Sequence, residues 1–194
     1  MQELEFAYFP NSGLISLLVT TEDGRTVETG MVGKDGLIGV PLAVGLSISP
    51  LRYVVQIGGE GYRFKLNQFH NRQKLTPHFQ MALSRYAVVQ GMEVAQTAAC
   101  NQLHELGPRL ARWLLMASDR VDSSSLPLTH DFLAATLGTD RPSVSLAAKV
   151  LEKNRIIQYK RGKIKILSTR RLESYSCECY RVIRQFNRML EQKG

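Results

Sequence analysis

Hydrophobic and polar positions follow a short-range alternation over the first third of the chain. The mostly apolar run Leu14–Val19 predicts a compact strand, and after the turn Glu22–Arg25 apolar and polar residues alternate over Thr26–Val32. Such runs, separated by Gly and Pro, are typical of antiparallel strands. Further strands are predicted at Leu37–Val40, Tyr53–Ile57 and Tyr62–Leu66. Residues 1–74 are therefore expected to form a small β-barrel or β-roll.

From Pro77 the pattern becomes helical and continues without another Pro to about Leu106. Its positions recur at four-then-three spacing, which indicates a narrow seam of the coiled-coil type. A helix packed only on its own domain would show similar spacing, and Arg85 and Gly91 weaken the heptad. We nevertheless expect residues 75–106 to form a connecting helix that dimerises. The seam consists of Met81, Arg85, Val88, Met92, Ala95 and Ala99.

Two further amphipathic helices are predicted in the second half. The segment Arg109–Ser118 has Leu110, Trp113, Leu114 and Ala117 on one side, which we expect to face inward. A last helix is expected from Arg170 to about Gln192, with Thr169 as its N-cap. Its apolar stripe is typical of a core or partner surface and contains Leu172, Tyr175, Cys179, Val182, Ile183, Phe186 and Leu190.

Between these helices, residues 128–167 indicate two short helices followed by a hairpin. Thr129 can cap a first helix over His130–Leu137, and Gly138 can end it in a left-handed conformation. Thr139 or Asp140 can cap a second helix, in whose first turn Pro142 is tolerated. This order of elements suits a helix that enters a DNA groove and a wing that contacts the backbone.

The second helix separates an apolar side from a polar one. Val144, Ala147, Ala148 and Leu151 fall on the side expected to be core. A basic turn at Lys160–Lys163 joins two strands of the predicted wing. The N-terminal end of a recognition helix usually meets base edges, and a basic wing suits phosphates. The candidate DNA-contact residues are Thr129, Arg141, Ser143, Ser145, Lys149, Lys153, Lys160, Arg161 and Lys163.

Net charge is distributed unequally along the chain. Residues 1–103 carry eight Lys or Arg and eight Asp or Glu, whereas residues 104–194 carry seventeen and nine, so the second half holds the whole excess of +8. A helical hairpin with solvated lysines would be the ordinary alternative. Together with the helix–turn–helix pattern, this asymmetry favours a polyanionic partner, namely nucleic acid.

Composition excludes several classes of protein. No apolar run approaches the ~18–20 residues of a membrane span, and the N-terminus lacks a secretion signal, which predicts a soluble cytoplasmic protein with no membrane partner. Three cysteines do not make a disulfide framework. Cys177 and Cys179 form a lone CxC pair with no second pair at metal spacing, which favours two free thiols on a helix over a metal or redox role, and no metal site is predicted.

A β-roll, a long helix and a winged helix–turn–helix, in this order, resemble the Crp/Fnr family of bacterial transcription regulators over nearly the whole chain. The resemblance is most specific in LTHDFLAATLGTDRPSVSLAAKVLEKNRIIQYKRGKIKIL and extends to LARWLLM and LISLLVTTEDGRTVETGMVGKDGLIG. It implies a roll that senses a signal, a helix that forms homodimers and a head that reads a palindromic operator in double-stranded DNA. RNA polymerase is a further partner that the resemblance suggests.

The resemblance also assigns roles within the second helix. Arg141 matches the family's base-reading arginine, Ser143 a hydroxyl residue that contacts the backbone, and Lys149 a basic position farther along. Pro142 and Leu146 depart from the pattern, because many members have an acidic residue at the first position and a polar or basic one at the second. DNA binding is therefore implied, but the family's preferred operator is not.

The sensor half departs further from the family. Members that bind cyclic nucleotides use a Gly-Glu pair and an Arg-Ser pair, whereas here Val40 follows Gly39 and Pro50-Leu51 stands at the second site. A phosphate buried without a cation is costly, so we expect no cyclic nucleotide. Iron–sulfur members carry an N-terminal cysteine cluster, whereas the first cysteine here is Cys100. No cofactor is predicted. Members usually have strands before the equivalent of Tyr8–Pro10, which implies a roll that starts near its middle.

The sequence thus predicts an α+β protein with a β-roll over 1–74, a dimerisation helix over 75–106 and a winged helix–turn–helix over 107–194. We expect a homodimeric DNA-binding regulator with no enzymatic activity. A ligand-independent DNA-binding protein is the main alternative. A cupin-like enzyme on the roll is disfavoured, because residues 1–69 contain no histidine to hold a catalytic metal.

Overall fold

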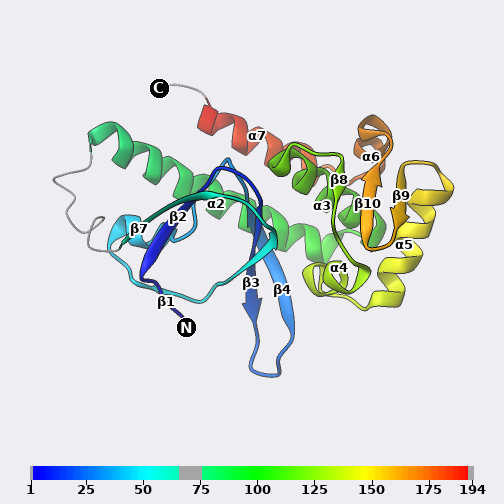
Figure 1. Ribbon diagram of the computed structural model, residues 1–194, viewed down its shortest axis with the longest axis horizontal. Helices are drawn as coiled ribbons and strands as arrows, with labels where there is room; N and C mark the ends of the chain where they lie inside the picture. Colours follow the sequence, from blue (N-terminus) through cyan, green and yellow to red (C-terminus); the bar gives the residue numbers. More distant parts are fainter. Residues whose placement is uncertain (1, 66–75, 192–194) are drawn as a thin grey trace.

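The computed structural model describes residues 2–65 and 76–191, with strands in the N-terminal part and mainly helices after it (Figure 1). The strands pair antiparallel in the orders β4-β3-β6, β2-β7 and β1-β5. The predicted strands at Leu14–Val19, Thr26–Val32 and Tyr53–Ile57 are confirmed, and Tyr62–Leu66 corresponds to β7 except for Leu66, which lies outside the described residues. The bounds are β1 Gln2–Glu3, β2 Phe6–Pro10, β3 Leu14–Thr20, β4 Thr26–Val32, β5 Ile48–Ser49, β6 Arg52–Ile57 and β7 Gly61–Lys65.

The strand expected at Leu37–Val40 does not form. Ile38 makes only an isolated antiparallel bridge to Tyr8, and a 3-10 helix, η1, occupies Val40–Val44. Gly39 has a left-handed φ of 90°, which turns the chain out of an extended path. Pro41 has no amide donor for a ladder. The alternation of apolar residues alone could not show this interruption.

The long helix α2 covers Pro77–Leu103 and ends three residues before its predicted limit. Thr76 caps it by accepting a hydrogen bond from the Phe79 amide at 3.2 Å. One side of the helix is buried and packs on β4, η1 and a C-terminal helix that lies alongside it (Figure 1). His104 and Glu105 are extended and separate α2 from the next helix.

The C-terminal half is built around helix α3, Leu106–Val121, whose Leu110, Trp113, Leu114 and Ala117 are buried as predicted. Two short helices and a three-stranded sheet in the order β8-β10-β9 pack with it into one hydrophobic core. These elements are α4 His130–Leu137, α5 Arg141–Lys153, β8 Ser125–Leu126, β9 Ile157–Lys160 and β10 Lys163–Ile166.

The single last helix predicted from Arg170 is wrong, because the structure has two helices there. Helix α6 covers Thr169–Tyr175, with Ser168 rather than Thr169 as its cap, and α7 covers Cys179–Glu191. The chain is extended at Ser176, and Cys177 turns inward to meet Cys100 of α2. Neither Gly nor Pro marks the break, and Ser176 ends α6 by donating its hydroxyl to the Glu173 carbonyl at 2.8 Å.

A buried ionic cluster ties the roll to both long helices. Arg120 of α3 is 5% exposed, and its Nη2 lies 3.2 Å from both carboxylate oxygens of Glu93 in α2. Its Nε lies 3.5 Å from Asp35, which follows β4. Removing one partner of such a buried pair would leave an uncompensated charge, so the cluster fixes how the three elements meet. No helix in the described part of the chain combines the length and apolar character that a membrane span requires.

Candidate nucleic-acid interface

The two helices of the turn are held by local caps. Thr129 accepts a hydrogen bond from the Phe132 amide at 3.2 Å at the start of α4, and Gly138 ends that helix with φ 63°. Asp140 then caps α5 by accepting from the Ser143 amide at 2.8 Å. Arg109 of α3 donates to the Leu137 carbonyl at 2.6 Å, which supplies a partner for the free end of α4. The predicted bounds of α4 and its capping residue are confirmed.

Helix α5 presents cations to solvent along one side. Val144, Ala148 and Leu151 are fully buried against the core. Arg141, Ser145, Lys149 and Lys153 recur every four residues, so they form one stripe on the helix. The three cations are exposed, and Ser145 is half-buried. Leu146 and Val150 are exposed beside this stripe, which adds an apolar surface next to the charges.

The residues predicted to contact DNA from the start of α5 make contacts within the protein. The Arg141 guanidinium lies 3.3 Å from Asp131 of α4, and both side chains are exposed. Ser143 donates its hydroxyl to Asp140 at 2.8 Å. The Ser145 hydroxyl lies 2.9 Å from His130 Nδ1. Arg141 is thus positioned by an exposed and replaceable pair, whereas the two serines already have partners.

Strands β9 and β10 form a two-stranded wing with cations on its outer face. Arg161 and Gly162 both have positive φ, 50° and 73°, as in the two-residue turns that suit hairpins. A left-handed conformation costs a non-glycine residue roughly 1–2 kcal/mol, so Arg161 stands where Asn or Gly would be less strained. Lys160 lies directly opposite Lys163. Like charges in this position repel, which an anionic ligand would relieve.

Residues at the start of α4 join the wing to helix α5. The His130 ring stacks on Tyr159 of β9 with centroids 4.1 Å apart and also contacts Ser145 of α5. Burial, with the nearby Arg141 charge, lowers the pKa of His130. The turn of the wing packs close by, since a Cβ on Gly162 would lie 3.7 Å from Thr129. The wing and the N-terminal half of α5 therefore form one surface.

The seam predicted for dimerisation lies mostly on the free side of α2. Met81 and Val88 are 62% and 64% exposed, and Ala95 and Ala99 are also exposed. Met92 is half-buried. Arg85 is half-buried too, because its guanidinium donates to the Met189 carbonyl in α7 at 2.5 Å. Within residues 2–65 and 76–191, this mostly apolar stripe therefore lies open, while Arg85 contacts α7 of its own chain.

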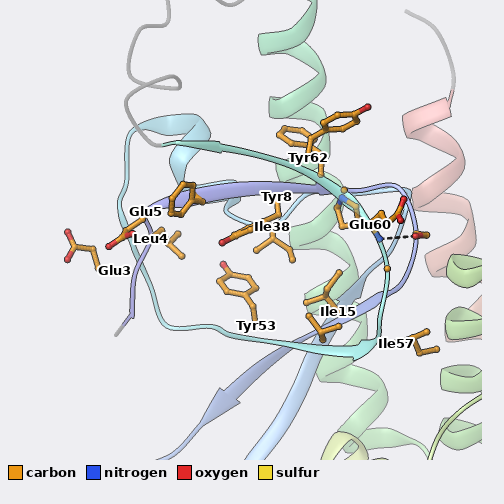
Figure 2. Close-up of a pocket in the computed structure, with 17 residues that line it drawn as sticks. Glu3, Leu4, Glu5, Tyr8, Ile15, Ile38, Tyr53, Ile57, Glu60 and Tyr62 are labelled. Carbon is orange, nitrogen blue, oxygen red and sulfur yellow. Dashed lines mark hydrogen bonds between the residues drawn. The ribbon is translucent and has the colours of Figure 1, made fainter.

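The roll contains an open cavity of about 710 Å³ (Figure 2). Tyr8, Ile15, Ile38 and Tyr53 lie around its centre. Glutamates are the only charged side chains among the described residues that line it, namely Glu3, Glu5 and Glu60. Its wall is therefore a poor environment for a phosphate.

Several contributors were absent from the sequence-based set. Lys165 is exposed on the same face of β10 as Lys163, and its place in the strict alternation could have revealed it. The roles of His130 and Tyr159 depend on packing between α4 and β9, for which the sequence has no local signal. A cluster of Cys100, His104, Cys177 and Cys179 was also missed, because its halves are more than 70 residues apart. The expectation of two thiols on one helix is wrong for Cys177, which precedes α7.

Comparison with known proteins identifies the domain that carries this surface. Residues 108–175 match the family of Crp-like helix-turn-helix domains. This range contains α4, α5 and the wing, so the resemblance inferred from the sequence is confirmed there. No curated protein sequence matches the chain significantly.

Solved structures share the fold over nearly the whole chain. FixK2 of Bradyrhizobium japonicum has a TM-score of 0.77 at 15% identity, covering 91% of this chain and 89% of that one. A Crp-family transcriptional regulator of Thermus thermophilus has a TM-score of 0.71 at 21% identity, covering 90% and 89%. The c-di-GMP responsive global regulator CLP of Xanthomonas campestris has a TM-score of 0.69 at 14% identity, covering 87% of each chain. At these identities the similarity establishes a common fold.

Proposed function

This chain contains a Crp-like helix-turn-helix domain within the fold of solved Crp/Fnr regulators, and on that premise we propose that it regulates transcription as a homodimer that binds specific DNA. The observation that carries the proposal is the surface joined at His130. There the exposed stripe of α5 meets a basic wing in the half of the chain that holds all the net charge.

The two parts of this surface have different tasks. Arg141 at the N-terminal end of α5 reads base edges in the major groove, leaving Asp131 for a guanine. Ser143 and Ser145 contact the DNA through their hydroxyls, which Asp140 and His130 orient in the free protein. Lys149 and Lys153 follow along the helix toward the phosphates. The cations of the wing, with Thr129 beside its turn, bind the backbone: Lys160, Arg161 and Lys163, together with Lys165.

Dimerisation through α2 supplies the second head. The exposed Met81 and Val88 lie seven residues apart, and Ala95 continues the row. A left-handed pair of helices would bury this row, and the small Ala95 and Ala99 would allow a close approach. Two heads related by a two-fold axis would read two half-sites of a palindrome.

The effector is a ligand other than a cyclic nucleotide. The cavity of the roll offers glutamates, whereas a cyclic phosphate needs a cation. Val40 stands in η1 after Gly39, where the family's nucleotide-binding members have a glutamate for the ribose. Equal operator affinity in cell extract and after exhaustive dialysis would instead support a regulator that needs no ligand.

Selection of bound duplexes from a random DNA pool tests the proposal. We expect a palindrome whose half-site centres are about one helical turn, 10–10.5 base pairs, apart or a multiple of it. A recovered non-palindromic site would contradict the dimer. Recovery of no sequence preference, at a salt concentration where the protein still binds DNA, would contradict specific regulation.

A further inference from the structure

Four side chains that can bind a metal ion meet where α2 ends and α7 begins. Cys100 lies in the last turn of α2, His104 directly follows that helix, and Cys177 and Cys179 flank the start of α7. Their donor atoms all lie within 4.8 Å of one another. The three thiols are free and buried, while the His104 ring is partly exposed.

Distances within the cluster match those around a single tetrahedral ion. Cys100 Sγ lies 3.5 Å from Cys177 Sγ, and Cys179 Sγ lies 3.6 Å from His104 Nδ1. With zinc–sulfur bonds of about 2.3 Å and zinc–nitrogen bonds of about 2.0 Å, tetrahedral ligand atoms are separated by roughly 3.5–3.8 Å. An iron–sulfur cluster would hold its thiolates farther apart, because iron and sulfide atoms stand between them.

The residues around the donors are those that a metal site needs. His104 Nε2 lies 3.2 Å from Glu178 Oε1, which leaves Nδ1 facing Cys179. Metal-bound histidines usually donate their other N–H to a carboxylate in this way, and the partner orients the ring. Gln96 donates to Cys179 Sγ at 3.1 Å. The Cys-Glu-Cys motif therefore supplies two thiolates and the carboxylate that orients the histidine.

Charge balance points to the same conclusion. Three thiolates and one divalent cation carry a net charge of −1, which needs a nearby cation when buried. Arg112 of α3 is 3% exposed and interacts electrostatically with Cys100 and Cys177. Its Nε has no hydrogen-bond partner within the described ranges. Apolar packing of three thiols would give no reason for an imidazole, a carboxylate and a guanidinium around them.

We propose that Cys100, His104, Cys177 and Cys179 bind one Zn²⁺ ion that fastens α2 to α7. Thiolate and imidazole donors favour zinc over magnesium or calcium, and four protein ligands make a closed structural site. The ion lies beside the extended residues His104 and Glu105, where the chain passes from α2 into the C-terminal half. The site stands independently of DNA binding.

Metal content of the full chain, purified in reductant without chelator, tests the site first. We expect about one zinc per chain, and a thiol reagent should react with the three cysteines only after a strong chelator is added. Replacement by Co²⁺ should give the intense visible absorption of tetrahedral cobalt together with thiolate-to-cobalt charge transfer. Absence of metal together with absence of that spectrum would overturn the proposal, as would stoichiometric iron and sulfide or a Cys100–Cys177 disulfide under these conditions.

Variants at partly exposed residues test the assignment without emptying the core. Glu178→Gln should lower zinc affinity by about 10–100-fold, the usual effect of losing such a partner. His104→Ala should lower it further and shift the Co²⁺ spectrum toward a site with three thiolates. His78→Ala, at an exposed position in the first turn of α2, serves as the matched control and should leave affinity unchanged. Equal zinc affinity in all three variants would show that the cluster does not hold the ion.

Discussion

Trp113 of α3 donates its indole N–H to Glu28 of β4, with 2.6 Å between Nε1 and Oε1. Both side chains are buried, at 2% and 5% exposure. Ser16 donates to the other carboxylate oxygen of Glu28. Burial raises the pKa of Glu28 to about 7, although the hydrogen bonds from Ser16 and Trp113 oppose the shift. A titratable group therefore lies between the roll and the C-terminal half.

This contact predicts a pH-dependent stability. Because the folded pKa of Glu28 is near 7 and its ordinary value is 4.5, the folded state binds the proton more tightly than the unfolded state. The contribution of this protonated carboxyl to the free energy of unfolding is fully present below about pH 4.5 and is lost as the pH rises to about 7. Glu28→Gln should be more stable than the parent at pH 8 by roughly 1–3 kcal/mol and about equal near pH 5.

Urea unfolding at several pH values measures this difference. Glu22→Gln, in the exposed turn of the same hairpin, is the matched control and should follow the parent at every pH. A parallel pH profile for the parent and Glu28→Gln would contradict the assignment of the titration to Glu28.

The wing should contribute affinity without specificity. Lys160→Ala combined with Lys163→Ala removes the two cations that face each other across the hairpin. We expect weaker binding to every duplex and a slope of log affinity against log salt reduced by about 1.8, because each phosphate contact contributes about 0.9. Arg52→Ala, an exposed cation of β6, should leave the slope unchanged. An unaltered slope in the double variant would exclude the wing from the contact.

The seam of α2 should determine the oligomeric state. Val88→Glu places a charge at the centre of the exposed apolar row, and in a symmetric pair two such charges would face each other. We expect sedimentation or light scattering to report a monomer. Ala82→Glu, exposed but about 120° around the helix, should remain dimeric. A Val88→Glu protein that keeps the parent's mass would rule out this seam.

Elements with local signals were predictable from the sequence. Thr129, Gly138 and Asp140 fix the bounds of α4 and the start of α5, because caps and left-handed turns depend on neighbouring residues. The compact apolar run of β3, the turn after it and the alternation in β4 located this hairpin for the same reason. The resemblance then supplied the fold class, and N-terminal strands followed by helices and a C-terminal helix–turn–helix are present in the structure.

Elements that depend on distant contacts were not predictable. Between α6 and α7 the chain brings Cys177 against Cys100, and neither Gly nor Pro marks this break in the sequence. The pairing of Glu28 with Trp113 joins residues 85 positions apart. The apolar pattern predicted that Trp113 faces inward but could not indicate its partner. The cysteine cluster could not be predicted for the same reason, because neither Cys100 with His104 nor Cys177 with Cys179 forms a metal-binding motif by itself.

Arg141 tests the central claim most directly. Binding of Arg141→Ala to the selected duplex and to a random duplex should be compared with the parent at one salt concentration. We expect a loss of about 1–3 kcal/mol on the selected site, as for a bidentate guanine contact, and a much smaller loss on random DNA. Arg171→Ala, an exposed arginine of α6, should bind both as the parent does. Equal losses for Arg141→Ala on the two duplexes would contradict base readout by this helix.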